Sequence, residues 1–218
     1  MPNGLHNGDI LIKHSDGSLT NKLIRFGQFF GRGESKFTHA GILPDHHNII
    51  EMDGHGLQRH ALNQPPNNRV RYTVYSCQNR KLGRAAASVA DMMLSNFGSG
   101  GNQTITYDKG GALGSIWSRT GAGDTGDLGS QALDRLLGAG DAFFCSGHVV
   151  LCYQIAASQL SITGQTQGNF PIQQFNQLFS LKDTCYQPAY LEKILRQPNS
   201  GFTCTGIYVG EVRQQVGG

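Results

Sequence analysis

Apolar and polar positions alternate over short stretches in the first third of the chain. Strands are predicted at residues 8–13 and 71–75, and two apolar runs at 37–43 and 49–52 flank a polar turn, which is typical of a hairpin. Apolar residues then recur at helical spacing in residues 19–30, 81–97 and about 146–157. This pattern predicts an α+β fold in which a small antiparallel sheet packs against helices.

The composition changes between residues 98 and 140, where glycine becomes frequent. We expect a single domain over residues 1–218 with a glycine-rich insertion or long loop in this segment. Trp117 and the stretch 128–137 suggest a short helix or lid that lies near Cys145. No phosphate-binding glycine motif is present, so nucleotide binding is not expected.

Charge, cysteine count and hydropathy limit the classes of partner and cofactor. The 218 residues carry a formal charge of +3 without a basic block, so a nucleic-acid partner is not expected. No apolar run approaches the roughly 20 residues that cross a bilayer, so no integral membrane segment is expected. The start of the chain lacks the pattern of a signal peptide, which predicts a cytoplasmic protein as synthesised, with any export by a route without a leader.

The five cysteines are an odd number without a CxxC pair, so neither a zinc ribbon nor a complete disulfide framework is predicted. Histidines and carboxylates gather in residues 45–60, but none has the spacing of a known zinc motif. We therefore expect no metal and no cofactor.

One cysteine lies where its thiol can be activated. Cys145 precedes an apolar run with helical spacing, and the positive end of a helix stabilises a thiolate. The alternative is that Cys145 is one of several small buried residues. A base is available in His39, on the first strand of the predicted hairpin, and Glu51 on the second strand could orient its imidazole. This arrangement depends on register, because a slip of one residue would turn Glu51 to the other face.

The order of these motifs resembles the permuted papain-like group of the NlpC/P60 superfamily, which includes YiiX-like and lecithin:retinol acyltransferase-like (LRAT-like) proteins. In that group the histidine strand precedes the cysteine helix. The resemblance rests on Gly8-Asp9-Ile10-Leu11-Ile12, Thr38-His39-Ala40-Gly41-Ile42, Glu51, Tyr107-Asp108, Phe144-Cys145-Ser146 and a late proline in Gln187-Pro188-Ala189-Tyr190-Leu191. It implies a circularly permuted papain-like fold with the nucleophile at a helix N-terminus.

The resemblance also implies roles for individual residues. Cys145 matches the nucleophile, His39 the general base and Glu51 the polar third residue. Tyr107 and Asp108 match a pair that helps to build the wall of the site, and with Ser146 they are the predicted substrate-binding residues. The chain departs from many permuted members after the cysteine, where it has Ser146-Gly147-His148 in place of a small residue and a carboxylate. We expect His148 to be a core histidine bonded to the backbone.

The implied activity is that of a thiol hydrolase (a cysteine peptidase or amidase) that forms a thioester acyl-enzyme. The expected substrate is an amide in a peptide, an isopeptide or a peptidoglycan stem peptide. A lipid acylhydrolase or acyltransferase that acts on fatty-acyl esters is an alternative, and a catalytically inert binding module of the same fold is a second. A small enzyme of this kind would suit a bacterial effector, for which an inhibitory (immunity) protein is the expected partner.

Overall fold

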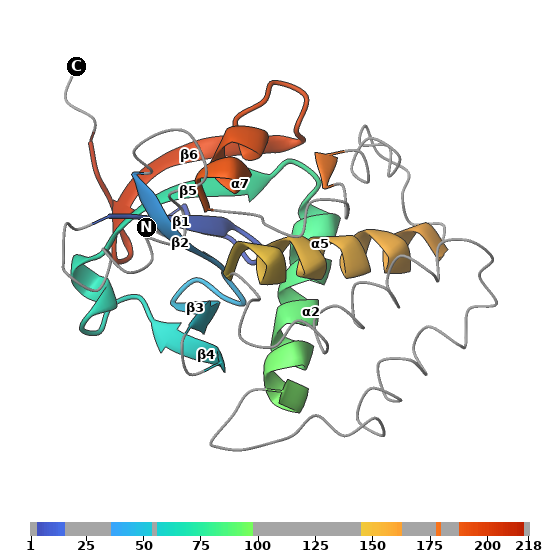
Figure 1. Cartoon of the computed structure of the whole chain (residues 1–218), viewed down its shortest axis with the longest axis horizontal. Helices are drawn as coiled ribbons and strands as arrows, with labels where there is room; N and C mark the ends of the chain where they lie inside the picture. The colour runs from blue at the N-terminus through green and yellow to red at the C-terminus, as the bar shows by residue number, and fades with distance from the viewer. Residues whose placement is uncertain are drawn as a thin grey trace.

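The computed structural model describes residues 4–15, 36–53, 56–97, 145–162, 178–179 and 188–215. The strands in these segments form one curled antiparallel sheet with the order β4-β3-β2-β1-β5-β6-β7 (Figure 1). The strands are β1 (Ile10–His14), β2 (Phe37–Ile42), β3 (Asn48–Asp53), β4 (Gly56–Ala61), β5 (Arg71–Cys77), β6 (Phe202–Val209) and β7 (Val212–Arg213). The helices are α2 (Arg80–Phe97), α5 (Cys145–Ile162) and α7 (Pro188–Leu195), with a 3-10 turn at Asn67–Arg69.

Each face of the sheet has its own apolar core, because successive side chains of a strand point to opposite faces. Ile10, Ile12, Ala40 and Ile42 share a core with α2, α5 and α7, which lie against that face. The alternate positions build a second core on the other face, from Leu5, Leu11, Leu43, Ile49, Leu62, Tyr72, Val74 and Tyr208. The central strands are therefore buried on both sides, which fixes their register.

The two long helices differ in how their apolar residues are distributed. Asn79 caps α2, since its side-chain oxygen accepts hydrogen bonds from the backbone N–H groups of Lys81 and Leu82. One stripe of α2 is buried, as expected for an amphipathic helix that covers a sheet. In contrast, buried residues surround most of α5, which packs against α2 and against β2 and β3. The position of α5 between these elements places its first residue beside β2.

The predicted elements can be compared with those observed. The strands expected at 8–13 and 71–75 correspond to β1 and β5, the hairpin to β2 and β3, and the helices to α2 and α5. The cysteine helix extends to Ile162, five residues beyond its predicted end. The helix predicted at 19–30, the glycine-rich segment, Trp117 and the stretch 128–137 lie outside the described residues, and the single-domain organisation stays a prediction.

None of the helices within the described segments combines the length and the apolar character that crossing a membrane requires.

Candidate active site

Cys145 is the first residue of α5 and lies against the middle of the sheet. Its side chain is 7% exposed, and its sulfur accepts a hydrogen bond from the backbone N–H of Ala40 at 3.3 Å. The first N–H groups of a helix have no partner within the helix, and they carry partial positive charge. No acidic residue lies in the first turn of α5 to offset that charge. The sulfur therefore has donors or positive potential on two sides.

A gap between β2 and β3 makes room for this sulfur. The two strands pair at Gly41–Glu51 and Ile42–Ile50. One residue before this ladder, the N–H of Ala40 binds the Cys145 sulfur instead of a strand partner. A strand N–H lies in the plane of its sheet and points toward the neighbouring strand. The sulfur therefore occupies the position that the next residue of β3 would fill if the β2–β3 ladder continued.

His39 connects the thiol to a carboxylate. Its Nε2 lies 2.9 Å from Oε2 of Glu51, and its side chain is also hydrogen-bonded to Cys145. Because Nε2 is bonded to the carboxylate, Nδ1 is the ring nitrogen available for the hydrogen bond with the sulfur. The three side chains form a chain of hydrogen bonds from thiol to imidazole to carboxylate, which is the geometry of a nucleophile, a base and an orienting group.

The register of the hairpin decides that Glu51 reaches His39. Glu51 pairs directly with Gly41, two positions along β2 from His39, so the two side chains are diagonal neighbours on one face. A Cβ atom on Gly41 would lie 2.6 Å from the Ile49 side chain and 2.9 Å from the Ile50 carbonyl oxygen. Glycine at this position therefore permits the close approach of β2 and β3 beside the His39–Glu51 pair.

The electrostatics of the site favour a charged imidazole. Burial by itself lowers the pKa of His39, but the charge and hydrogen bond of Cys145 and those of Glu51 outweigh it and raise the pKa to about 10. Burial likewise works to raise the pKa of Glu51, yet the hydrogen bond from His39 and nearby positive charges hold it below its usual value. An imidazolium beside the Glu51 carboxylate is therefore the form of His39 that the site favours at neutral pH.

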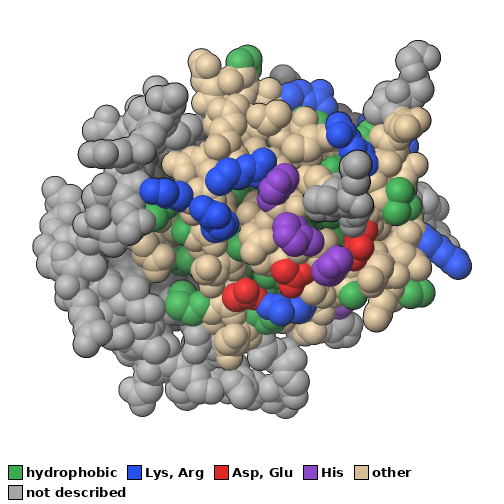
Figure 2. Space-filling view, turned by 180° about the vertical axis from the view of Figure 1, so that it is seen from behind, with side chains coloured by type: hydrophobic (Ala, Val, Ile, Leu, Met, Phe, Trp, Pro, Cys, Tyr) green, Lys and Arg blue, Asp and Glu red, His purple; other side chains and the backbone are tan. Residues whose placement is uncertain are grey.

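Further polar groups surround the carboxylate. His60 on β4 places Nε2 3.7 Å from Oε1 of Glu51, and Lys13 lies opposite His39 in the β1–β2 register. Gln58 faces Glu51 across β3 and β4. One side of the molecule, seen in Figure 2, carries histidine side chains close together with acidic and basic side chains around them. The sheet face beside the thiol–imidazole pair is thus polar, although the positions further along it are apolar.

The other predicted site residues have different placements. Tyr107 and Asp108 lie outside the described residues. Ser146 is in the first turn of α5 and is fully buried, so its contact with a substrate stays a prediction. His148 is a core histidine, but its expected bond to the backbone is wrong. Its Nε2 lies 3.5 Å from the Cys152 sulfur, a contact between positions four apart in the helix, and its Nδ1 has no hydrogen-bond partner within the described segments.

The remaining described thiols have surroundings unlike those of Cys145. Burial raises the pKa of Cys77 to about 12 and that of Cys152 still further. Cys204 lies on β6 and is exposed. All four described cysteines are free. Only at Cys145, among these four, do a buried imidazole and a strand N–H meet the sulfur.

Two contributions to the site could not be found from the sequence. The Ala40 N–H has no side-chain signal, because any residue except proline carries it. His60 stands in β4, and its approach to Glu51 depends on the offset between β3 and β4, which no local motif specifies. Within the described ranges, no group of three or more His, Cys, Asp or Glu side chains is placed to hold a metal ion.

The chain was also compared with known proteins. No protein-family model, no curated protein and no solved structure matches it.

Proposed function

We propose that the protein is a papain-like thiol hydrolase of the permuted NlpC/P60 type, with Cys145 as nucleophile, His39 as base and Glu51 as orienting group. The observation that carries this proposal is the continuous path from the Cys145 thiol through His39 to Glu51, with the 2.9 Å contact at its carboxylate end. The motif order in the sequence, with the histidine strand before the cysteine helix, supports the same family. A buried ionisable group with a strongly shifted pKa beside a nucleophile is typical of active sites.

In the proposed reaction, the Cys145 thiolate attacks the carbonyl carbon of an amide. The N–H of Cys145 at the start of α5 is placed to stabilise the oxyanion. The C–N bond then breaks, the His39 imidazolium gives its proton to the leaving amine, and a thioester remains on the sulfur. Water attacks the thioester carbonyl while His39 accepts a proton from it, the C–S bond breaks, and the carboxylic acid leaves Cys145 as the thiolate.

An amide is the preferred substrate over a fatty-acyl ester. Several described groups beside Glu51 and His39 on their sheet face are polar or charged, namely Lys13, Gln58 and His60. Such groups suit a peptide-like substrate with polar substituents more than an acyl chain, which needs apolar contacts along its length. A peptide, isopeptide or peptidoglycan stem peptide is therefore the substrate class to test first, with phospholipid vesicles as the comparison.

Selective alkylation tests the proposal without a known substrate. We expect iodoacetamide at about pH 6 to modify Cys145 at least tenfold faster than the exposed Cys204, because a thiolate is the reactive form and an ordinary thiol has a pKa of about 8.5. Peptide mass spectrometry would give the rate at each cysteine. His39→Ala should remove the selectivity, whereas Cys204→Ser should leave the rate at Cys145 unchanged. Equal rates at Cys145 and Cys204 in the wild type would favour the inert binding module.

A further inference from the structure

Glu51 contacts imidazoles on two neighbouring strands. Its Oε2 lies 2.9 Å from Nε2 of His39, and its Oε1 lies 3.7 Å from Nε2 of His60. The two oxygens of one carboxylate therefore meet different rings. The family resemblance assigns no role to His60.

The sheet register explains why the three side chains meet. Glu51 pairs with Gly41 on β2 and with Gln58 on β4, so positions two residues from either partner lie on the same face. His39 and His60 occupy these positions, on opposite diagonals from Glu51. A glutamate has three rotatable side-chain bonds, and one hydrogen bond leaves its carboxyl group free to turn about that contact. A second contact on the other oxygen limits this rotation.

We propose that His60 is a positioning residue that holds the Glu51 carboxylate toward His39. This inference rests on the proposed function, since it assigns His60 a role in activating Cys145. His60 is 36% exposed at its side chain, against 10% for Glu51. His60 acts through Glu51 and His39 and does not itself touch the sulfur.

Other charges around the carboxylate set the size of the effect. Lys13 on β1 contributes positive charge to Glu51 and remains in any His60 variant. His39 contributes the stronger contact from β2, and the charge of Glu51 in turn acts on the buried phenol of Tyr72 on β5. The contact between His60 and Glu51 is longer than a hydrogen bond and partly exposed. We therefore expect a change of about two- to fivefold, the range of a partly exposed ion pair.

The pH dependence of Cys145 alkylation provides the test on the full chain. When His60 is removed, Glu51 should protonate at a higher pH and hold the His39 imidazolium less firmly beside the sulfur, so the Cys145 thiolate should be less stabilised. In His60→Ala the acidic limb of the rate profile should shift to higher pH, and the rate on that limb should fall about two- to fivefold. His60→Gln keeps a side-chain N–H group without the charge, so its plateau rate should match the wild type while its acidic limb stays shifted.

His47→Ala is the matched control. His47 lies in the turn between β2 and β3, and it also pairs with a glutamate, Glu211, at 3.0 Å. It should reproduce the wild-type profile. The inference is overturned if His60→Ala also gives the wild-type profile while Cys145 remains selectively labelled over Cys204. Loss of that selectivity in the wild type would instead overturn the proposed function. Thermal unfolding of each variant separates a shifted limb from a loss of folded protein.

Discussion

His39 lies between two groups that each favour its charged form. The Cys145 sulfur and the Glu51 carboxylate contact the ring from opposite nitrogens, and together they outweigh the effect of burial. His148, one turn into α5, is the contrast. It is fully buried, and burial lowers its pKa to about 4. The pKa values of the two histidines thus shift in opposite directions because, among the described residues, His39 has a carboxylate partner and His148 has none.

Replacement of the thiol should therefore change the titration of His39. In Cys145→Ser the thiolate is absent while Glu51 remains, so the pKa of His39 should fall below its wild-type value of about 10. Imidazole chemical shifts in an NMR pH titration would measure the midpoint. Glu51→Gln should lower it as well, and Cys204→Ser should not change it. An unchanged midpoint in Cys145→Ser would contradict a thiolate–imidazolium pair.

At the scale of the elements, the antiparallel pairing of β2 and β3 sets the geometry of the site. Their ladder ends where the Ala40 N–H turns to Cys145, so the same strand provides the base and a donor to the sulfur. Gly41 lies at this point, opposite Glu51, with the Ile49 side chain and the Ile50 carbonyl too close for a Cβ atom. The packing of the hairpin and the orientation of Glu51 are therefore coupled.

Gly41→Ala should separate the strands and loosen the contact between His39 and Glu51. We expect a loss of about 1–3 kcal/mol in the free energy of unfolding, typical of overpacking, together with slower alkylation of Cys145. Denaturant titration and the labelling rate would measure the two effects. Gly83→Ala is a suitable comparison, because a Cβ there would meet its nearest atom at 3.4 Å, an ordinary contact, although glycine also favours the unfolded state. Wild-type labelling in Gly41→Ala would show that the site tolerates the shift.

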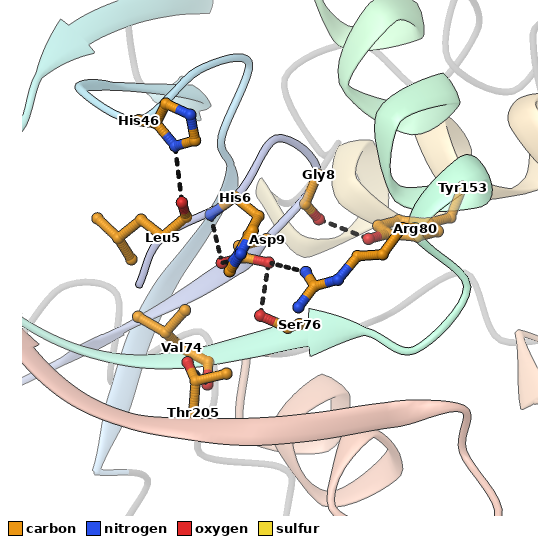
Figure 3. A network of polar contacts seen from close by, with 10 residues as sticks. All are labelled: Leu5, His6, Gly8, Asp9, His46, Val74, Ser76, Arg80, Tyr153 and Thr205. Carbon is orange, nitrogen blue, oxygen red and sulfur yellow. Dashed lines mark hydrogen bonds and ion pairs between the residues drawn. The ribbon is translucent and has the colours of Figure 1, made fainter. Parts of the chain in front are cut away.

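At the scale of the whole molecule, a buried carboxylate connects the N-terminal turn, the sheet and a helix. Asp9 accepts hydrogen bonds from the His6 backbone N–H at 2.8 Å and the Ser76 hydroxyl at 2.6 Å, and Arg80 of α2 lies 3.7 Å from it (Figure 3). Beside it, the Tyr153 hydroxyl of α5 donates to the Gly8 carbonyl oxygen. The network therefore joins both long helices to the start of β1, on which β2 and the site depend.

This network predicts a pH dependence of stability. Burial raises the pKa of Asp9 above its ordinary value, only partly opposed by the hydrogen bonds from Ser76 and His6 and by the charges of His6 and Arg80. The folded state therefore binds this proton more tightly than the unfolded state. The free energy of unfolding should decrease as the pH rises from the pKa of Asp9 in the unfolded chain through its raised pKa in the folded protein. Asp9→Asn should lack this component in unfolding experiments across that range.

Asp9→Ala tests the hydrogen bonds rather than the charge. It leaves the Ser76 hydroxyl and the His6 N–H without their acceptor, and we expect a loss of about 1–3 kcal/mol in the free energy of unfolding. Thermal or denaturant unfolding at neutral pH would compare it with Asp9→Asn, which retains an acceptor and should lose less. Equal losses in the two variants would show that the hydrogen bonds contribute little.

Local patterns in the sequence were sufficient to predict most described elements. Alternation predicted β1, β5 and the hairpin, and helical spacing predicted α2 and α5, because these periods reflect which side of each element is buried. The predicted hydrogen-bond partner of His148 was wrong, because one of its ring nitrogens contacts Cys152 of the same helix and not the backbone. Cys145 at the start of an apolar helix was also readable from sequence, because helix position and charge at its N-terminus are local properties.

Only the tertiary structure decided how these residues meet. The sulfur of Cys145 contacts Ala40 across 105 positions of sequence, and Glu51 reaches both His39 and His60 through the pairing of three strands. A shift of one residue in either ladder would preserve every local pattern and turn the carboxylate to the opposite face. Strand register is chosen by packing on both faces of the sheet and by close approaches such as that at Gly41. The sequence by itself therefore identified the residue types of the site, whereas long-range packing determined the contacts between them.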